Sequence, residues 1–164
     1  GTEFEMFGDA LPAVMALSVV GEGMPMIYNG QEVGNRRRLA FFERDPIVWH
    51  DDQGNFIQHE NGALYQKLFA LKKANTALWN ANWGARMIPV HNSQAAQVLS
   101  FVRQNDKDKV FAVFNFSDSE QSVNFKAHLH HGQYVEYLSG DTAEFSADTR
   151  VTLPAWGYRI YVKN

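Results

Sequence analysis

The spacing of hydrophobic residues changes once along the 164 residues, and this change constrains the fold more than any other feature. Up to about residue 83, apolar residues recur at the spacing of helix faces or form short continuous runs. Afterwards they alternate every second residue, as in strands with one buried face. We therefore predict two parts, an α/β part at residues 1–83 and an all-β part at residues 84–164, which meet near residues 80–86.

The first part begins with two apolar segments. Residues 10–20 are apolar on nearly every side, which predicts a buried helix rather than an amphipathic surface helix. Asp9 is a plausible N-cap for it, and Pro12 is tolerable in its first turn. Residues 24–28 form a short apolar run bounded by glycines, which is typical of a strand covered on both faces.

A long loop and a second helix complete the first part. Residues 29–61 are irregular and rich in charge, and long structureless stretches in compact domains are usually functional loops. Residues 61–76 predict an amphipathic helix, because its leucines share one stripe and Lys67 and Lys72 lie off that stripe.

The second part contains a series of short alternating segments separated by turn residues. Residues 105–108 form the turn of a hairpin between the first two. Short strands at this spacing predict an antiparallel sandwich or Greek-key domain. The predicted strands are residues 98–103, 109–116, 121–126, 133–138, 150–153 and 157–162.

Composition argues against several classes of partner. The net charge is −3 and the arginines at 36–38 are the only basic run, so we expect no nucleic-acid partner. No apolar stretch approaches the roughly 20 residues of a membrane span, so we expect no membrane partner. The chain has no cysteine, which excludes disulfides and thiolate metal sites but fits any compartment, so the localisation stays open.

Two motifs carry a resemblance to a known family. Residues 23–34 read GMPMIYNGQEVG and resemble the last barrel strand of the α-amylase family, glycoside hydrolase family 13, although Glu22 stands where a proline is common. Residues 41–49, FFERDPIVW, resemble the loop that follows this strand. The resemblance implies the last βα unit of a TIM-type barrel at residues 1–83, followed by the family's all-β C-terminal domain at residues 84–164.

The resemblance also implies a chemistry. Family members are retaining glycoside hydrolases acting on α-1,4-glucans such as starch and maltodextrin, with an Asp nucleophile and a Glu acid/base about 5–5.5 Å apart. A third Asp lies in an Asn-His-Asp motif shortly before the segment that residues 8–10 resemble, and residues 1–7 contain no such motif. We therefore expect the catalytic carboxylates to lie upstream of residue 1, and the 164 residues alone to be inactive.

The same resemblance bears on cofactors. Many α-amylases bind calcium, mainly through residues of an upstream insertion, so we expect no cofactor in this chain itself. His128 and His130 would share a strand face, but no third ligand type is indicated nearby, so we predict no metal site.

Three residues are candidates for substrate binding. Gln31 and Glu32 follow the predicted barrel strand at its C-terminal end, where such barrels place their active sites, and Arg36 lies in the following loop. The alternatives are structural: Glu32 ties the loop by buried hydrogen bonds, and the arginines pair with Glu43 or Asp45. We expect packing rather than sugar stacking for the four tryptophans. These are Trp49, Trp79, Trp83 and Trp156.

Other functions remain open on the sequence. The β part could be a non-catalytic α-glucan-binding module, or the chain could be an interaction domain whose apolar N-terminal helix docks on a partner. Without barrel neighbours, residues 9–20 and 24–28 would leave an apolar patch and an unpaired edge, so we expect the isolated chain to self-associate. Substrate specificity, and hydrolysis versus transfer, are not decided by these residues.

Overall fold

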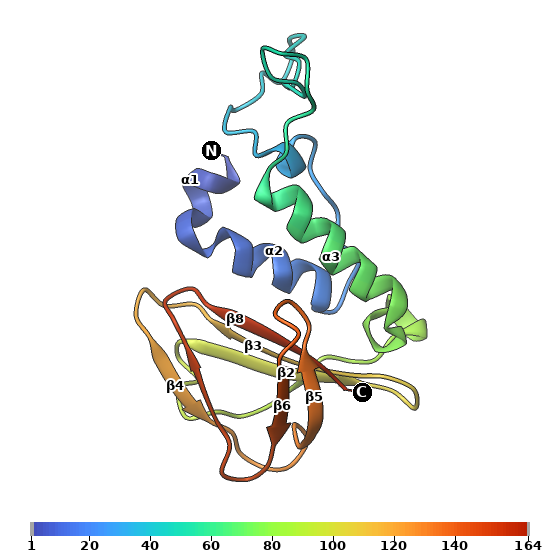
Figure 1. The fold of residues 1–164 in the computed structure, drawn as a ribbon, viewed down its shortest axis with the longest axis vertical. Helices are drawn as coiled ribbons and strands as arrows, with labels where there is room; N and C mark the ends of the chain where they lie inside the picture. The colour runs from blue at the N-terminus through green and yellow to red at the C-terminus, as the bar shows by residue number, and fades with distance from the viewer. Residues whose placement is uncertain (1, 164) are drawn as a thin grey trace.

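The computed structural model describes residues 2–163 and places a layer of helices on one face of an antiparallel sheet (Figure 1). All the helices precede all the strands in the chain, in agreement with the change of hydrophobic spacing. The helices are α1 (Glu3–Phe7), α2 (Leu11–Val20) and α3 (Glu60–Ala74), and the 3-10 turns are η1 (Gly8–Ala10), η2 (Gln31–Val33), η3 (Thr76–Leu78) and η4 (Ala81–Trp83).

The strands form two antiparallel sheets. One sheet has six strands in the order β1-β2-β3-β8-β5-β6, and the other pairs β4 with β7. All six predicted strands are present, and the hairpin of β2 and β3 has the predicted turn, whereas the short edge strands β1 and β6 were missed. The bounds are β1 (Ile88–Pro89), β2 (Val98–Gln104), β3 (Lys109–Asn115), β4 (Gln121–Asn124), β5 (Gly132–Glu136), β6 (Thr142–Phe145), β7 (Arg150–Leu153) and β8 (Tyr158–Lys163).

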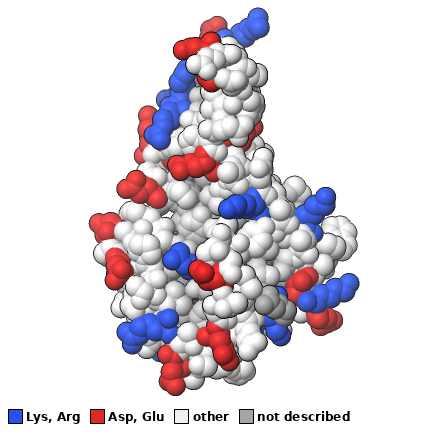
Figure 2. All heavy atoms as spheres, viewed as in Figure 1, with Lys and Arg blue, Asp and Glu red and all other residues white. Residues whose placement is uncertain are grey.

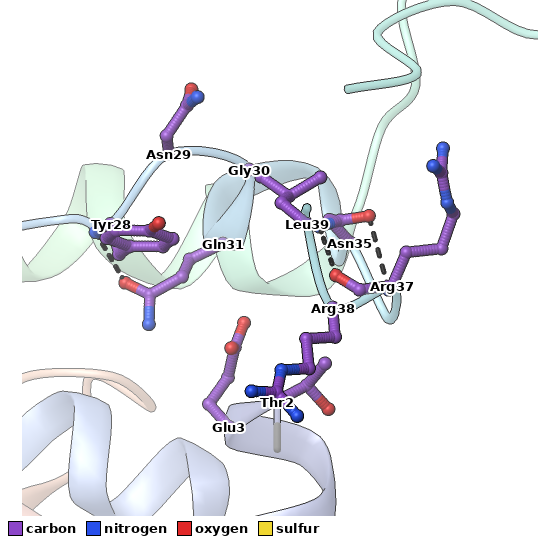
Figure 3. A pocket seen from close by; sticks show the side chains of 10 residues that line it. All are labelled: Thr2, Glu3, Tyr28, Asn29, Gly30, Gln31, Asn35, Arg37, Arg38 and Leu39. Atoms are coloured by element: carbon purple, nitrogen blue, oxygen red, sulfur yellow. Dashed lines mark hydrogen bonds between the residues drawn. The ribbon is translucent and has the colours of Figure 1, made fainter. Parts of the chain in front are cut away.

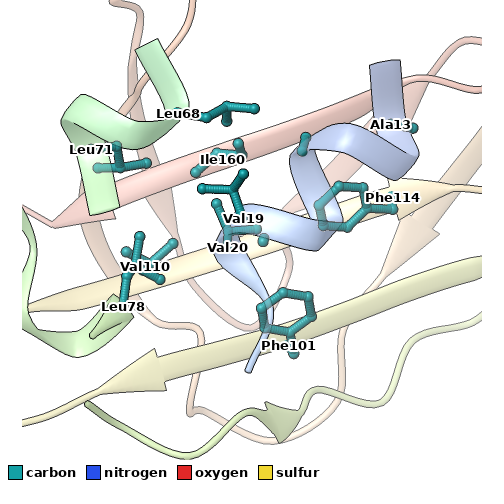
Figure 4. Close-up of a cluster of buried hydrophobic side chains, with 12 residues drawn as sticks. Ala13, Val19, Val20, Leu68, Leu71, Leu78, Phe101, Val110, Phe114 and Ile160 are labelled. Carbon is teal, nitrogen blue, oxygen red and sulfur yellow. The ribbon is translucent and has the colours of Figure 1, made fainter. Parts of the chain in front are cut away.

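Strand β3 lies at the centre of the molecule and is buried along its whole length. Successive side chains of a strand point to opposite faces, so β3 serves two cores. Val110 and Phe114 pack under α2 and α3 (Figure 4). Phe111 and Val113 pack on the other face, in a second core that β4 and β7 join.

Helix α2 is buried as predicted, with Pro12 in its first turn. The prediction of Asp9 as its N-cap is wrong. Asp9 belongs to the 3-10 turn η1, and the N-cap position falls on Ala10, which makes no side-chain cap. Helix α3 begins at Glu60, where Nδ1 of His59 accepts a hydrogen bond from the N–H of Asn61 at 3.1 Å.

Lys72 departs from its predicted exposed position on α3. Its side chain is only 8% exposed, because its ammonium reaches the backbone at the end of α2. Lys67, predicted to lie off the apolar stripe as well, is exposed.

The predicted strand at residues 24–28 does not form a ladder. A strand needs a neighbour for its N–H and C=O groups, and no other segment of residues 2–163 pairs with this one. Its apolar side chains are left open, with Met24 at 82% and Met26 at 79% exposure.

The molecular surface carries charges of both signs. Figure 2 shows Lys and Arg interspersed with Asp and Glu over the visible face, with no continuous basic stripe. None of the helices in residues 2–163 combines the length and apolarity needed to cross a membrane.

Candidate functional site

A polar pocket of about 270 Å³ lies where the loop after residue 28 passes the start of α1 (Figure 3). It is built from the end of the GMPMIYNGQEVG motif, from the loop residues that follow the motif, and from the first residues of the described chain. Its lining residues are Thr2, Glu3, Tyr28, Asn29, Gly30, Gln31, Asn35, Arg37, Arg38 and Leu39.

Gln31 is the best anchored of these residues. Its Oε1 accepts hydrogen bonds from the N–H of Tyr28 at 2.8 Å and from the hydroxyl of Tyr65 at 3.3 Å. Its carbonyl accepts from Nδ2 of Asn61 at 3.1 Å. The turn also needs Gly30, which has φ of +94°, and a Cβ there would lie 3.0 Å from Cβ of Asn35. Helix α3 thus fixes Gln31 in the pocket wall.

Glu32 turns away from this pocket. Its Oε2 accepts a hydrogen bond from the N–H of Gly30 at 3.1 Å, which stabilises the loop from within. Its side chain contributes instead to a second cavity of about 380 Å³, beside Phe56, His59 and Tyr65. The geometry therefore separates Glu32 from Gln31, although the two are adjacent in sequence.

The three arginines have three different surroundings. The guanidinium of Arg36 lies 4.1 Å from the ring centroid of Phe4, outside the polar pocket. Arg37 forms an ion pair with Asp45, one of the two partners predicted for the run. A hydrogen bond from the N–H of Ala40, and then the Arg37 guanidinium, lower the pKa of Asp45. Arg38 lines the pocket.

The pocket is polar and carries charged as well as neutral groups. Arg37 and Arg38 bring guanidinium donors, Nε2 of Gln31 is a further donor, and the ring of Tyr28 offers an apolar surface. Among the residues that line the pocket, only Glu3 carries a carboxylate. A single carboxylate does not provide the acid and nucleophile pair of a glycosidase.

The sequence analysis missed several of these residues. Tyr28 and Asn29 lie within the quoted motif, so the motif could have indicated them. Glu3 and Asn35 carry no local signal, because only the approach of α1 to the loop brings them together.

The tryptophans differ in their surroundings. Trp49 stacks on Phe56 with ring centroids 6.4 Å apart, in agreement with the predicted packing role. Trp156 is partly buried. Trp79 is 42% exposed and donates from Nε1 to the carbonyl of Lys73. Trp83 is 76% exposed, so it does not pack in the core of the described chain.

The histidines near residue 130 do not share a strand face, contrary to the sequence interpretation. They lie in the connection between β4 and β5. His130 is fully buried beside Phe111 and Phe125, whereas His128 is exposed. Across residues 2–163, no three His, Asp or Glu side chains are grouped as metal ligands would be.

Comparisons of this chain with known proteins agree with one another in the kind of protein they find. Residues 87–160 match the family described as Maltogenic Amylase, C-terminal domain. Alpha-amylase 2 of Dictyoglomus thermophilum is 27% identical over 127 residues, covering 72% of this chain and 20% of that protein. The 1,4-alpha-glucan branching enzyme GlgB of Mycobacterium sp. (strain KMS) is 29% identical over 128 residues, covering 76% of this chain and 16% of that protein.

Solved structures share the fold. A noncanonic maltogenic alpha-amylase, AmyB from Thermotoga neapolitana, has a TM-score of 0.76 at 17% identity, over 94% of this chain and 36% of that one. AmyP in complex with maltose has a TM-score of 0.64 at 18% identity, over 94% of this chain and 33% of that one. The chain spans about a fifth of the length of the D. thermophilum amylase. The matched C-terminal domain and these relatives agree with one another: the chain is similar, over most of its length, to a C-terminal part of members of the α-amylase family, glycoside hydrolase family 13.

Proposed function

We propose that these residues form the C-terminal part of an enzyme that acts on α-1,4-glucans such as starch and maltodextrin. In this proposal residues 1–83 are the closing βα unit of a (β/α)8 barrel, and residues 84–164 are the β-domain that supports it. The names of the relatives support the substrate class, and the order of a buried helix, a long loop, an amphipathic helix and an antiparallel domain supports the assignment of parts.

The observation that carries the proposal is that the motif-bearing segment builds the polar pocket. We assign the pocket to one rim of the glucan-binding cleft, since its amides and its tyrosine ring match the hydroxyls and apolar faces of a sugar. The Oε1 atom of Gln31 is taken up by Tyr28 and Tyr65, which leaves the Nε2 amide to donate to a sugar hydroxyl. Glu32 and Arg36 act through the loop rather than on the sugar.

Hydrolysis itself belongs, in this proposal, to the whole enzyme. A retaining glycosidase needs two carboxyl groups about 5–5.5 Å apart on either side of the scissile bond. The pocket offers only Glu3 among its lining residues, so we assign it to binding and not to bond cleavage.

Incubation of the chain with maltoheptaose and soluble starch tests the assignment. We expect no release of reducing sugar above the blank and no shift in melting temperature at millimolar maltoheptaose. Release of reducing sugar would show catalysis within these residues. A shift in melting temperature that persists after Gln31→Ala would favour the glucan-binding module over the cleft rim.

In the whole enzyme, Gln31→Ala is expected to raise KM for maltoheptaose several-fold, because one hydrogen bond to the sugar is lost. Gln104→Ala is the matched control, since Gln104 is exposed at the end of β2. An unchanged KM in the Gln31 variant would remove Gln31 from the cleft.

A further inference from the structure

Helix α2 ends at a group of backbone carbonyls that face two buried cations from other elements. Arg103 of β2 is 1% exposed and Lys72 of α3 is 8% exposed. Every hydrogen bond that these two side chains make within residues 2–163 goes to a backbone carbonyl. Two buried cations with this arrangement are unusual, because buried charges are commonly paired with carboxylates.

Arg103 connects the end of α2 to the chain that leads into the β part. Its Nη1 donates to the carbonyls of Gly21 at 2.6 Å and Val20 at 3.3 Å. Its Nη2 donates to the carbonyl of Trp79 at 2.9 Å, and its Nε to that of Ala85 at 2.9 Å. The planar guanidinium has donors on three nitrogens in a fixed fork, so Arg103 bonds both segments at once.

Lys72 holds the same helix end from the side of α3. Its Nζ donates to the carbonyls of Val19 at 3.3 Å, Gly23 at 3.3 Å and Leu78 at 2.6 Å. The last carbonyls of a helix have no partner within the helix and carry partial negative charge, so cations there are favourable.

Glu22 lies between these carbonyls and is held by the β part as well. Its Oε2 accepts a hydrogen bond from the N–H of Met87 at 2.9 Å, and its Oε1 pairs with Nε of Arg86 at 3.0 Å. Each of the five residues from Val19 to Gly23 thus has a polar contact with a residue that is far away in sequence.

This segment leads directly to the pocket. Residues 24–27 pair with no strand, so the path from Gly23 to Tyr28 depends on how its two ends are held. Gln31 fixes the far end through Tyr28 and Tyr65, and the cations fix the near end.

We propose that Arg103 and Lys72 are positioning residues, a two-cation clasp through which strand β2 and helix α3 together set the place of the pocket-forming segment. The inference rests on the proposed function only in taking the pocket as part of a glucan-binding cleft. A side chain that merely fills the core would stabilise the whole molecule evenly, whereas the clasp acts on residues 19–31.

Amide hydrogen exchange of the chain, measured without sugar, separates these two roles. In Arg103→Met we expect exchange across residues 19–31 to become at least about tenfold faster, while exchange in β3 and β8 stays within about twofold of the unchanged chain. Arg159→Met is the matched control, because within residues 2–163 the Arg159 guanidinium bonds only the neighbouring carbonyl of Tyr158 on β8. Equal acceleration in β3 and in residues 19–31 would overturn the clasp.

Two further variants keep the test decisive if Arg103→Met does not fold. Arg103→Lys keeps the charge but loses the fork, and Lys72→Met removes the second cation, so each is expected to accelerate exchange in residues 19–31 more than in β3. Unchanged exchange in both variants would overturn the clasp. The two proposals can fail separately. Faster exchange in residues 19–31 would uphold the clasp, even if the whole enzyme does not act on maltoheptaose and the proposed function is rejected.

Discussion

The hydroxyl of Tyr65 donates a hydrogen bond to Oε1 of Gln31 at 3.3 Å and so joins helix α3 to the loop that forms the polar pocket. The two residues are 34 positions apart in sequence, so the contact ties the loop to a distant helix. Burial, followed by the nearby carboxylates of Glu3 and Glu32, raises the pKa of Tyr65, so its hydroxyl stays protonated and remains a donor at neutral pH.

Removal of this hydroxyl should loosen the pocket. We expect Tyr65→Phe to lower the free energy of unfolding by about 0.5–1.5 kcal/mol, the usual net contribution of one hydrogen bond. Urea denaturation measures this loss. Tyr137→Phe is the matched control, because its hydroxyl donates to the carbonyl of Lys67 in an exposed setting. A loss no greater than that of the control would show that the Gln31 contact contributes nothing.

His130 makes the β part sensitive to acid. It is fully buried, and its ring lies 5.5 Å from that of Phe111 and 5.1 Å from that of Phe125. Burial, then the nearby charges of His131 and Lys109, lower the pKa of His130 to about 4. The folded chain therefore keeps this imidazole neutral down to a pH at which the unfolded chain has already bound a proton.

The direction of the pH dependence follows from this difference. Between about pH 6.5 and pH 4 the unfolded state binds more protons, so the free energy of unfolding should fall as the pH falls, by up to about 3 kcal/mol. Denaturation series at several pH values measure the slope. His130→Phe should flatten this slope, whereas the exposed His91→Gln should leave it unchanged. An equal slope in the two variants would show that other groups cause the acid sensitivity.

Gly84 should not tolerate a side chain. A Cβ at this position would lie 1.8 Å from the carbonyl oxygen of Trp79, which itself accepts a hydrogen bond from Arg103. We expect Gly84→Ala to lower the free energy of unfolding by more than about 2 kcal/mol, because backbone must move. Gly54→Ala is the control. Gly54 has a φ of +84° and open space for a Cβ, so this substitution should lower the free energy of unfolding by only about 1–2 kcal/mol. An equal loss of unfolding free energy in the two variants would show that the backbone around Gly84 accommodates a Cβ without strain.

The open apolar segment before the pocket should make the isolated chain self-associate. Met24 and Met26 are 82% and 79% exposed, and the exposed Tyr28 follows them. We expect concentration-dependent growth in apparent mass by light scattering, which Met24→Lys combined with Met26→Lys should reduce. Ser18→Lys, on the exposed position of α2, is the control. A compact monomer at all concentrations would contradict the prediction.

The sequence predicted the class and order of elements well, because hydrophobic spacing reports directly which faces are buried. Helices α2 and α3 and six of the eight strands were anticipated on this basis. Strand β1 was missed because two residues have no visible alternation. The run at residues 24–28 was read as a strand, but a strand exists only with a neighbour to pair with.

The site was harder to predict than the fold. Gln31 was identified because it follows the predicted strand within the motif, whereas Glu3 enters the same pocket only through the approach of α1 to the loop. Arg103 and Lys72 showed no signal at all, because nothing in a sequence of alternating or helical residues marks a cation whose partners are backbone carbonyls. Such partners are visible only in three dimensions.

The two-sided burial of β3 has a consequence for how this part of the molecule can vary among relatives. The matched unit, residues 87–160, includes the sheet up to the first half of β8 but not the helices that cover it. Wherever this unit occurs, the face bearing Val110, Ala112 and Phe114 must be covered by whatever precedes it. The unit therefore cannot be exchanged freely between hosts: each host has to supply a matching pair of apolar helices, and the sheet and its cover should change together.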